Sequence, residues 1–168
     1  MSSAISLEFQ YQPEDYLHAF RAHCARQLNL KLDIAVIIIL GSIGLAGLWY
    51  LPTLHYLSLI FLLISVSFSL MLIAAFTIVP VLIFRFEPKF RDQYFLTFSA
   101  TGIHFRTAYI DSQLQWSLYT RVFIDLHSYM LYYGTRSFTI IPKRVFRSAQ
   151  QQENFEQLLT EKMAKIIK

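Results

Sequence analysis

The sequence has few of the residues and motifs that mark catalytic or metal centres. Cys24 is the only cysteine among 168 residues, so the chain forms no internal disulfide bond and no cysteine-based metal cluster. The five histidines show no metal-ligand spacing supported by carboxylates. No G-x-S-x-G elbow, H-E-x-x-H motif or glycine-rich phosphate loop is present. We therefore expect no catalytic residue, no metal site and no cofactor, and a protein that is not an enzyme.

Charged side chains are missing from residues 34–84, a run of about 50 residues interrupted only by a polar patch at residues 52–56. An α-helix needs about 20 apolar residues to cross a hydrocarbon core of about 30 Å. This run is therefore long enough for two crossings joined by a short turn. The sequence predicts a transmembrane hairpin over residues 34–84, with crossings at about residues 34–51 and 57–80.

Small residues gather in both predicted crossings, where they let two helix backbones approach closely. Pro80 is expected to kink the second crossing or to mark its exit. The hairpin contains no charged residue to relay ions, so we expect no transport by a single chain. The small residues are Gly41, Ser42, Gly44, Ala46 and Gly47 in the first crossing and Ser58, Ser65, Ser67 and Ser69 in the second.

Positive charges flank the predicted hairpin on both sides, whereas the joining turn has none. Lys and Arg concentrate in the cytoplasmic segments of membrane proteins, so both termini are expected in the cytoplasm. Residues 85–168 hold 12 Lys or Arg against 7 Asp or Glu, whereas residues 1–84 hold 3 against 4. This basic excess after the hairpin favours the anionic surface of the lipid bilayer as a partner over nucleic acid.

Two segments precede the predicted hairpin. Residues 5–11 alternate apolar and polar side chains, which predicts a strand within residues 1–12. A lone strand is not stable, so it is expected to pair with the C-terminal sheet. Pro13, Glu14 and Asp15 predict the start of an amphipathic helix over residues 13–33. Such a helix can lie on the membrane surface or pack on the domain, and we favour one rod that continues into the first crossing.

Residues 85–168 predict a small antiparallel β domain closed by a C-terminal helix. Short alternating stretches are separated by turn residues, and Gly102 can take a positive φ in one of these turns. Ser148 and Gln151 form a capping box before the last helix, whose apolar face is expected to reach Ile166 or Ile167. The predicted strands are residues 93–99, 103–107, 113–116, 121–127, 129–133 and 137–141.

Three stretches of this domain resemble the YcxB-like family of small bacterial membrane proteins. They are residues 94–103, residues 116–124, and residues 138–146 with the run Ile-Pro-Lys-Arg-Val-Phe. The resemblance implies an N-terminal strand and helix, two transmembrane helices and a C-terminal β domain similar to a pleckstrin-homology (PH) fold. It also implies the bacterial cytoplasmic membrane as the location, and it carries over no catalytic residue. The predicted class is an α+β membrane protein.

Aromatic residues make up 16% of the chain and crowd the predicted sheet. Successive strand residues point to opposite faces, and one helix cannot bury both faces of a sheet. The sheet would then present an exposed aromatic strip to a partner protein. The leading hypothesis is a non-catalytic interaction or regulatory module for a membrane-protein partner. The residues predicted for this contact are Tyr119, Phe123, Tyr132 and Phe138.

Basic residues support an alternative hypothesis, a sensor of anionic lipid headgroups. A solvated charged turn, and the snorkelling of Lys and Arg beside a crossing, explain the same residues equally well. A third hypothesis is a component of an oligomeric channel or transporter, because two helices enclose a pore only when chains associate. The residues predicted to contact lipid are Arg136, Lys143, Arg144 and Arg147, and, directly after the hairpin, Arg85, Lys89 and Arg91.

Overall fold

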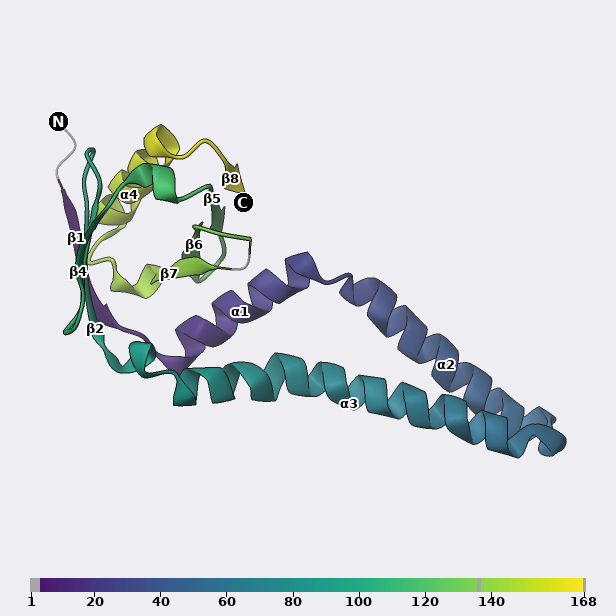
Figure 1. Ribbon diagram of the computed structural model, residues 1–168. Helices are drawn as coiled ribbons and strands as arrows, with labels where there is room; N and C mark the ends of the chain where they lie inside the picture. The colour runs from purple at the N-terminus through teal and green to yellow at the C-terminus, as the bar shows by residue number, and fades with distance from the viewer. Residues whose placement is uncertain (1–3, 136, 168) are drawn as a thin grey trace. The chain divides into compact units, whose positions relative to one another are not determined.

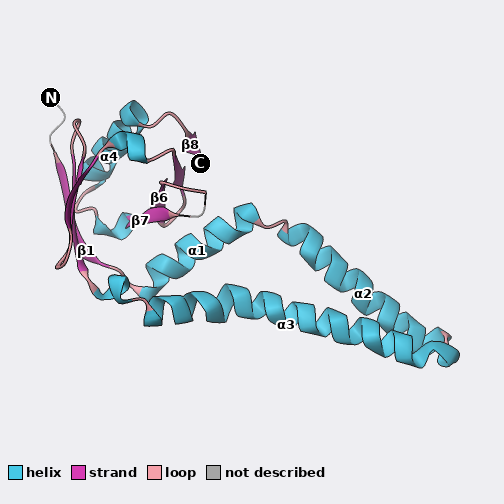
Figure 2. Ribbon diagram, viewed as in Figure 1, coloured by secondary structure: helices cyan, strands magenta, loops and turns pink. Residues whose placement is uncertain are grey.

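The computed structural model describes residues 4–135 and 137–167 and has an α+β fold in two compact units (Figure 1). The first unit consists of residues 1–20 and 84–168, and the second of residues 21–83. Figure 2 shows that the strands all belong to the first unit, whereas the second is helical. We refer to the first unit as the β domain.

One sheet of the β domain joins the N-terminus to the segment that follows the helices. Its strands are antiparallel and lie in the order β1-β2-β3-β4. β1 pairs with β2 along its whole length, from Ile5 opposite Phe98 to Gln10 opposite Gln93. The alternating side chains of β1 are buried and exposed in turn, as its sequence pattern requires. The strands are β1 (Ile5–Gln10), β2 (Gln93–Phe98), β3 (Ile103–Arg106) and β4 (Asp111–Leu114).

The second sheet has the order β7-β6-β5-β8, and its last strand was not predicted. Ile166 and Ile167 form β8, which pairs in parallel with β5. Placing these two residues on the closing helix was wrong, because that helix ends at Lys162 and the backbone of Met163 is extended. The two isoleucines instead fill the free edge of β5. The strands are β5 (Arg121–Ile124), β6 (Ser128–Tyr132), β7 (Phe138–Pro142) and β8 (Ile166–Ile167).

The closing helix α4 (Ala149–Lys162) supplies the centre of the core. Ser148 caps the helix, because its hydroxyl accepts a hydrogen bond from the backbone N–H of Gln151 at 3.1 Å. Phe155 on this helix is fully buried, and its ring contacts those of Phe98 and Tyr129 at centroid distances of 4.8 and 5.2 Å. α4 therefore joins both sheets into one core.

The turn between β2 and β3 needs glycine for a reason other than the one expected. None of the described residues has a positive φ, so Gly102 does not use the left-handed conformation that glycine allows. A Cβ atom at this position would lie 2.8 Å from the carbonyl oxygen of Leu114. Glycine is required because the β4 backbone passes too close for any side chain.

The helices are α1 (Pro13–Gln27), α2 (Leu30–Tyr50) and α3 (His55–Phe86), with a short 3-10 turn at Pro52–Leu54 between the last two. The expected continuous rod was wrong, because Asn29 has a non-helical ψ of 67° and separates α1 from α2. α2 and α3 are each long and apolar enough to cross a membrane, with mean hydropathy of 2.2 and 2.7. Both extend beyond the predicted crossings, and Pro80 lies inside α3.

α2 and α3 pack through the small residues that the sequence singled out. A Cβ atom on Gly44 would lie 2.7 Å from the Cγ of Leu62 and 3.0 Å from the carbonyl oxygen of Ser58. The hydroxyl of Ser65 donates to the carbonyl oxygen of Ile37 across the pair at 2.9 Å. The two helices are thus in contact at a distance that larger residues would not allow.

Candidate functional site

The β domain contains an aromatic pocket of about 340 Å³ between the ends of its two sheets. Seven of the residues that line it are aromatic. Tyr94 and Phe105 come from β2 and β3 of the first sheet, whereas Phe138 comes from the start of β7 in the second. Tyr11, which directly follows β1, and Lys89, which follows α3, also line the pocket. The pocket therefore lies where the chain leaves the β domain for α1 and returns from α3.

The rings of the pocket are held in place by contacts with one another. Tyr11 meets Tyr94 edge to face at a centroid distance of 4.8 Å, and Tyr94 meets Phe105 in the same way at 5.7 Å. Phe90 meets Tyr11 at 5.7 Å and Tyr16 at 4.7 Å. Each such pair contributes about 0.5–1.5 kcal/mol beyond the burial of its surface. The walls are therefore aromatic rings packed against one another, with polar atoms among them.

Two tyrosine hydroxyls of the pocket are already engaged within the domain. The hydroxyl of Tyr11 donates to the carbonyl oxygen of Ile140 at 2.6 Å and so links the first sheet to the second. The hydroxyl of Tyr94 donates to the carbonyl oxygen of Lys89 at 2.8 Å. Burial raises the pKa of Tyr11, and burial together with the carboxylates of Asp92 and Glu87 raises the pKa of Tyr94 to about 12. Both groups stay protonated at neutral pH, and both side chains line the pocket.

Positive charge lies beside the pocket. The Nζ atom of Lys89 is 3.4 Å from a carboxylate oxygen of Glu87, and both side chains are about half exposed. Arg91 donates to the carbonyl oxygen of Arg85 at 3.1 Å. Of the three basic residues predicted to contact lipid after the hairpin, Lys89 is part of the pocket wall, and the other two lie on the segment that leads to it.

The aromatic residues predicted to bind a partner do not form an exposed strip. Tyr119, Phe123 and Tyr132 are buried, with 7%, 8% and 4% of their surface exposed. For Tyr132 the reason is that β6 lies inside its sheet and all five of its residues are buried, so both of its faces belong to the core. Phe138 alone of the four lines the aromatic pocket. The prediction of an exposed strip was therefore wrong for the other three residues.

The basic residues after β7 have separate roles. Arg144 forms two hydrogen bonds with the buried carboxylate of Asp15, at 2.9 and 2.6 Å, and a third with the carbonyl oxygen of Gln10 at 2.9 Å. This clamp fixes the start of α1 to the β domain, so Arg144 is occupied by a structural contact. The ammonium group of Lys143 lies 5.1 Å from the ring centroid of Tyr129. Arg136 lies outside the described residues.

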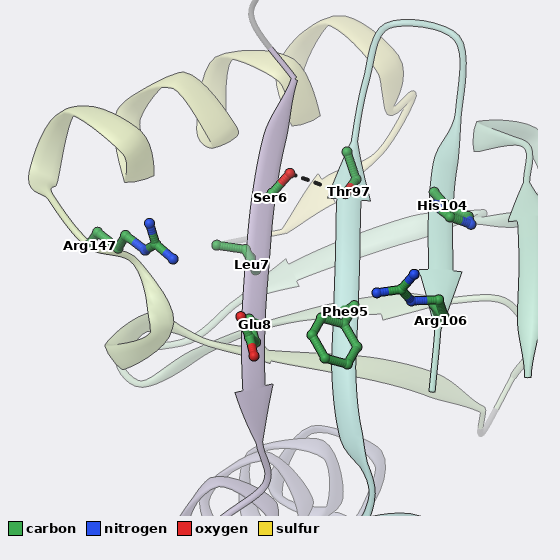
Figure 3. Close-up of a pocket in the computed structure, with 8 residues that line it drawn as sticks. All are labelled: Ser6, Leu7, Glu8, Phe95, Thr97, His104, Arg106 and Arg147. Carbon is green, nitrogen blue, oxygen red and sulfur yellow. Dashed lines mark hydrogen bonds between the residues drawn. The ribbon is translucent and has the colours of Figure 1, made fainter. Parts of the chain in front are cut away.

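A second hollow of about 320 Å³ lies on the outer face of the first sheet and includes Arg147 (Figure 3). Its polar side chains are largely paired with one another or with their neighbours. Ser6 and Thr97 share a hydrogen bond of 3.1 Å, and Glu8 accepts one from Gln93 at 2.8 Å. The guanidinium group of Arg106 stacks on the ring of Phe95 at 4.9 Å. This pattern is typical of a solvated sheet face, and the aromatic pocket is the better candidate site.

Sequence reasoning named two members of the aromatic pocket, Phe138 and Lys89, for two different functions. It missed Tyr11, Tyr94 and Phe105, although Tyr94 and Phe105 lie in predicted strands. The alternation of these aromatic residues with polar neighbours indicates that they are buried, but it does not indicate that they line the same pocket. Among residues 4–135 and 137–167, no group of three or more His, Cys, Asp or Glu side chains is placed to hold a metal ion.

The fold and the site define a small β domain joined to two long apolar helices. A family model described as YcxB-like protein matches residues 98–159, from the end of β2 into α4. Over this segment the chain is similar to YcxB-like proteins, and the match supports the resemblance found in the sequence. The matched segment contains Phe105 and Phe138 of the aromatic pocket. No curated protein and no solved structure matches the chain.

Proposed function

We propose that this protein is a membrane-anchored, non-catalytic binding module whose β domain binds its ligand in the aromatic pocket. The observation that carries the proposal is the position of the pocket, at the end of the β domain where the chain leaves for α1 and returns from α3. A ligand bound there contacts the segment that connects the domain to its anchor. Binding in the pocket is thereby coupled to the membrane.

The surface of α2 and α3 supports the membrane anchor. Large apolar side chains point outward, for example Leu45 and Leu63 with 64% and 67% of their surface exposed. Leaving such a side chain in water rather than in an apolar surrounding costs about 1.5–3 kcal/mol. Lys and Arg flank the pair and are absent from the joining turn, which favours both termini on the cytoplasmic side. The resemblance to YcxB-like proteins favours the bacterial cytoplasmic membrane.

The strand arrangement supports a PH-like domain. A four-stranded antiparallel sheet is followed by a second sheet and then by a C-terminal helix that packs into the core. In this interpretation the three helices α1 to α3 are an insertion between the first and second strands. The domain thus keeps one uninterrupted core, closed by α4, while the insertion reaches the membrane.

The pocket has properties of a small-ligand site. Its volume lies near the lower end of the range of about 300–1,000 Å³ that is common for such sites. Its walls are aromatic, and the polar side chains of Lys89, Ser137 and Thr139 also line it. A few polar groups in a mostly apolar pocket fix the orientation of a ligand.

A membrane-protein partner is the second candidate, and exposed apolar side chains outside the pocket favour it. Leu126 is 78% exposed and Leu118 is 44% exposed, and neither lines the pocket. An oligomeric channel has less support, because Gly44 and Ser65 are used for contact between α2 and α3 of the same chain. The small-ligand module needs the pocket for binding, whereas the module for a protein partner does not.

The proposal is tested by native mass spectrometry of the full-length protein purified in mild detergent from its own membranes. We expect a small bound molecule that is lost in Ser137→Trp, which places a bulky ring at the pocket, and retained in the matched control Ser117→Trp. Both serines are exposed in the wild-type protein. A bound molecule that survives Ser137→Trp would contradict the proposal. A stoichiometric protein partner retained by both variants, with no small molecule, would favour the second candidate.

A further inference from the structure

A chain of aromatic contacts runs from the end of α3 into the aromatic pocket. Phe84 in the last turn of α3 stacks on Phe90 at a centroid distance of 5.0 Å. Phe90 meets Tyr11 at 5.7 Å, and Tyr11 meets Tyr94 at 4.8 Å. These residues all belong to the β domain as defined above. The end of α3 is thus joined to the wall of the pocket by packed rings.

The outward-facing apolar surface of α3 reaches the same point. Leu82 is 44% exposed and Phe86, the last residue of the helix, is 75% exposed. Phe86 is only three residues before Lys89, which lines the pocket. Because a residue spans at most about 3.3–3.6 Å of chain, the pocket wall begins within about 11 Å of the end of this surface. A molecule lying against the end of α3 is therefore within reach of the pocket.

The charges at this point fit an anionic ligand. The segment from the end of α3 to the start of β2 has three basic and two acidic residues, namely Arg85, Lys89, Arg91, Glu87 and Asp92. The pair between Lys89 and Glu87 is solvent-exposed at 3.4 Å, and such pairs are weak and easily exchanged. A phosphodiester offers the lysine a charge-assisted hydrogen bond of the same kind as the carboxylate of Glu87, so it can replace Glu87 as the partner.

We propose that the ligand of the aromatic pocket is an anionic phospholipid, with its phosphate at Lys89 and its first acyl carbons against Tyr94, Phe105 and Phe138. This inference rests on the proposed function and names the ligand class of the same site. The apolar side chains take the acyl part. Lys89 favours a phosphate whose negative charge is not balanced by a neighbouring quaternary ammonium group, and so distinguishes anionic from neutral headgroups. The hydroxyls of Tyr11 and Tyr94 are engaged elsewhere, so their rings serve as apolar surface.

The test uses the full-length protein in dodecyl maltoside, titrated with dihexanoyl phosphatidylglycerol, dihexanoyl phosphatidylcholine or inorganic phosphate. We expect saturable binding of the phosphatidylglycerol, about tenfold tighter than that of the phosphatidylcholine, which corresponds to about 1.4 kcal/mol. Inorganic phosphate should bind far more weakly, because it lacks the acyl part. Lys89→Gln should remove the difference between the two lipids, whereas Lys162→Gln, on the exposed end of α4, should preserve it.

Equal binding of the two lipids by the wild-type protein would overturn the inference, as would an unchanged preference in Lys89→Gln. Binding of inorganic phosphate as tight as that of the anionic lipid would replace it by a free-phosphate site. If the pocket binds neither lipid but its natural bound molecule is still lost in Ser137→Trp, the lipid is wrong and the proposed function stands. If Ser137→Trp changes neither the binding of lipid nor that of the natural bound molecule, the proposed function itself fails.

Discussion

The β domain and the pair formed by α2 and α3 bury opposite kinds of side chain. In the β domain the buried positions are large, as at Phe98 and Phe155, with 1% and 0% of their surface exposed. In the helical pair the buried positions include Gly44 and Gly47, whereas Leu63 is 67% exposed. Water drives large apolar side chains inward, but helices surrounded by lipid gain nothing from this and pack through small residues. This contrast is what the proposed membrane anchor predicts for α2 and α3.

The largest effect should come from removing a large side chain from the β domain. Phe155→Ala empties the centre of a core where four rings meet, and we expect it to lower the free energy of unfolding by about 3–5 kcal/mol. The measurement is denaturant unfolding of the full-length protein in detergent, followed by the fluorescence of Trp116 in a Trp49→Phe background. The exposed Gln157 on the same helix gives the control, Gln157→Ala. Equal effects of the two variants would show that α4 does not carry the core.

The next effect should come from the clamp that attaches the start of α1 to the β domain. Arg144→Ala leaves the carboxylate of Asp15 buried without its charged partner. We expect a loss of about 2–3 kcal/mol, below the range for fully buried pairs because the Arg144 side chain is 39% exposed. The same unfolding measurement applies, with Arg147→Ala as the control for loss of a nearby basic residue. If both variants lose the same stability, the clamp is not specific.

The smallest of the three effects should come from adding a side chain between α2 and α3. Gly44→Leu places atoms where Leu62 and Ser58 already lie, and we expect a loss of about 1–3 kcal/mol. Ala35→Leu adds a similar side chain at an exposed position of α2 and should be nearly neutral. The loss of helical circular dichroism during titration with a denaturing detergent measures both variants. If Gly44→Leu loses no more stability than Ala35→Leu, the two parts do not differ in how they pack.

Local patterns were sufficient to place most of the elements. The charge-free run gave two long apolar helices, and the alternation of residues 5–11 gave β1 close to its observed bounds. Errors arose where neighbours in space decide the conformation. Ile166 and Ile167 fit the helical spacing of α4, but they form β8 because the edge of β5 is open to them. The backbone at Asn29 leaves the helical conformation, but the spacing of apolar residues continues past it and does not reveal the break.

The candidate site was predicted only in fragments. Lys89 and Phe138 were named, but for separate functions, and Tyr11, Tyr94 and Phe105 were not named at all. Tyr11 and Tyr94 are more than 80 residues apart and meet because β1 pairs with β2. Long-range pairing of this kind depends on which edges and faces remain free after the other strands have paired. No local pattern contains that information.

The sequence by itself determined the kinds of parts in this protein, because charge, periodicity and turn residues act over short distances along the chain. It determined two apolar helices, a strand-rich domain and a capped closing helix. Only the tertiary structure decided which aromatic residues are core and which line a pocket, and that Arg144 is held by Asp15. The physical reason is that burial and ion pairing depend on all the elements that surround a residue, and in this protein those elements come from both ends of the chain.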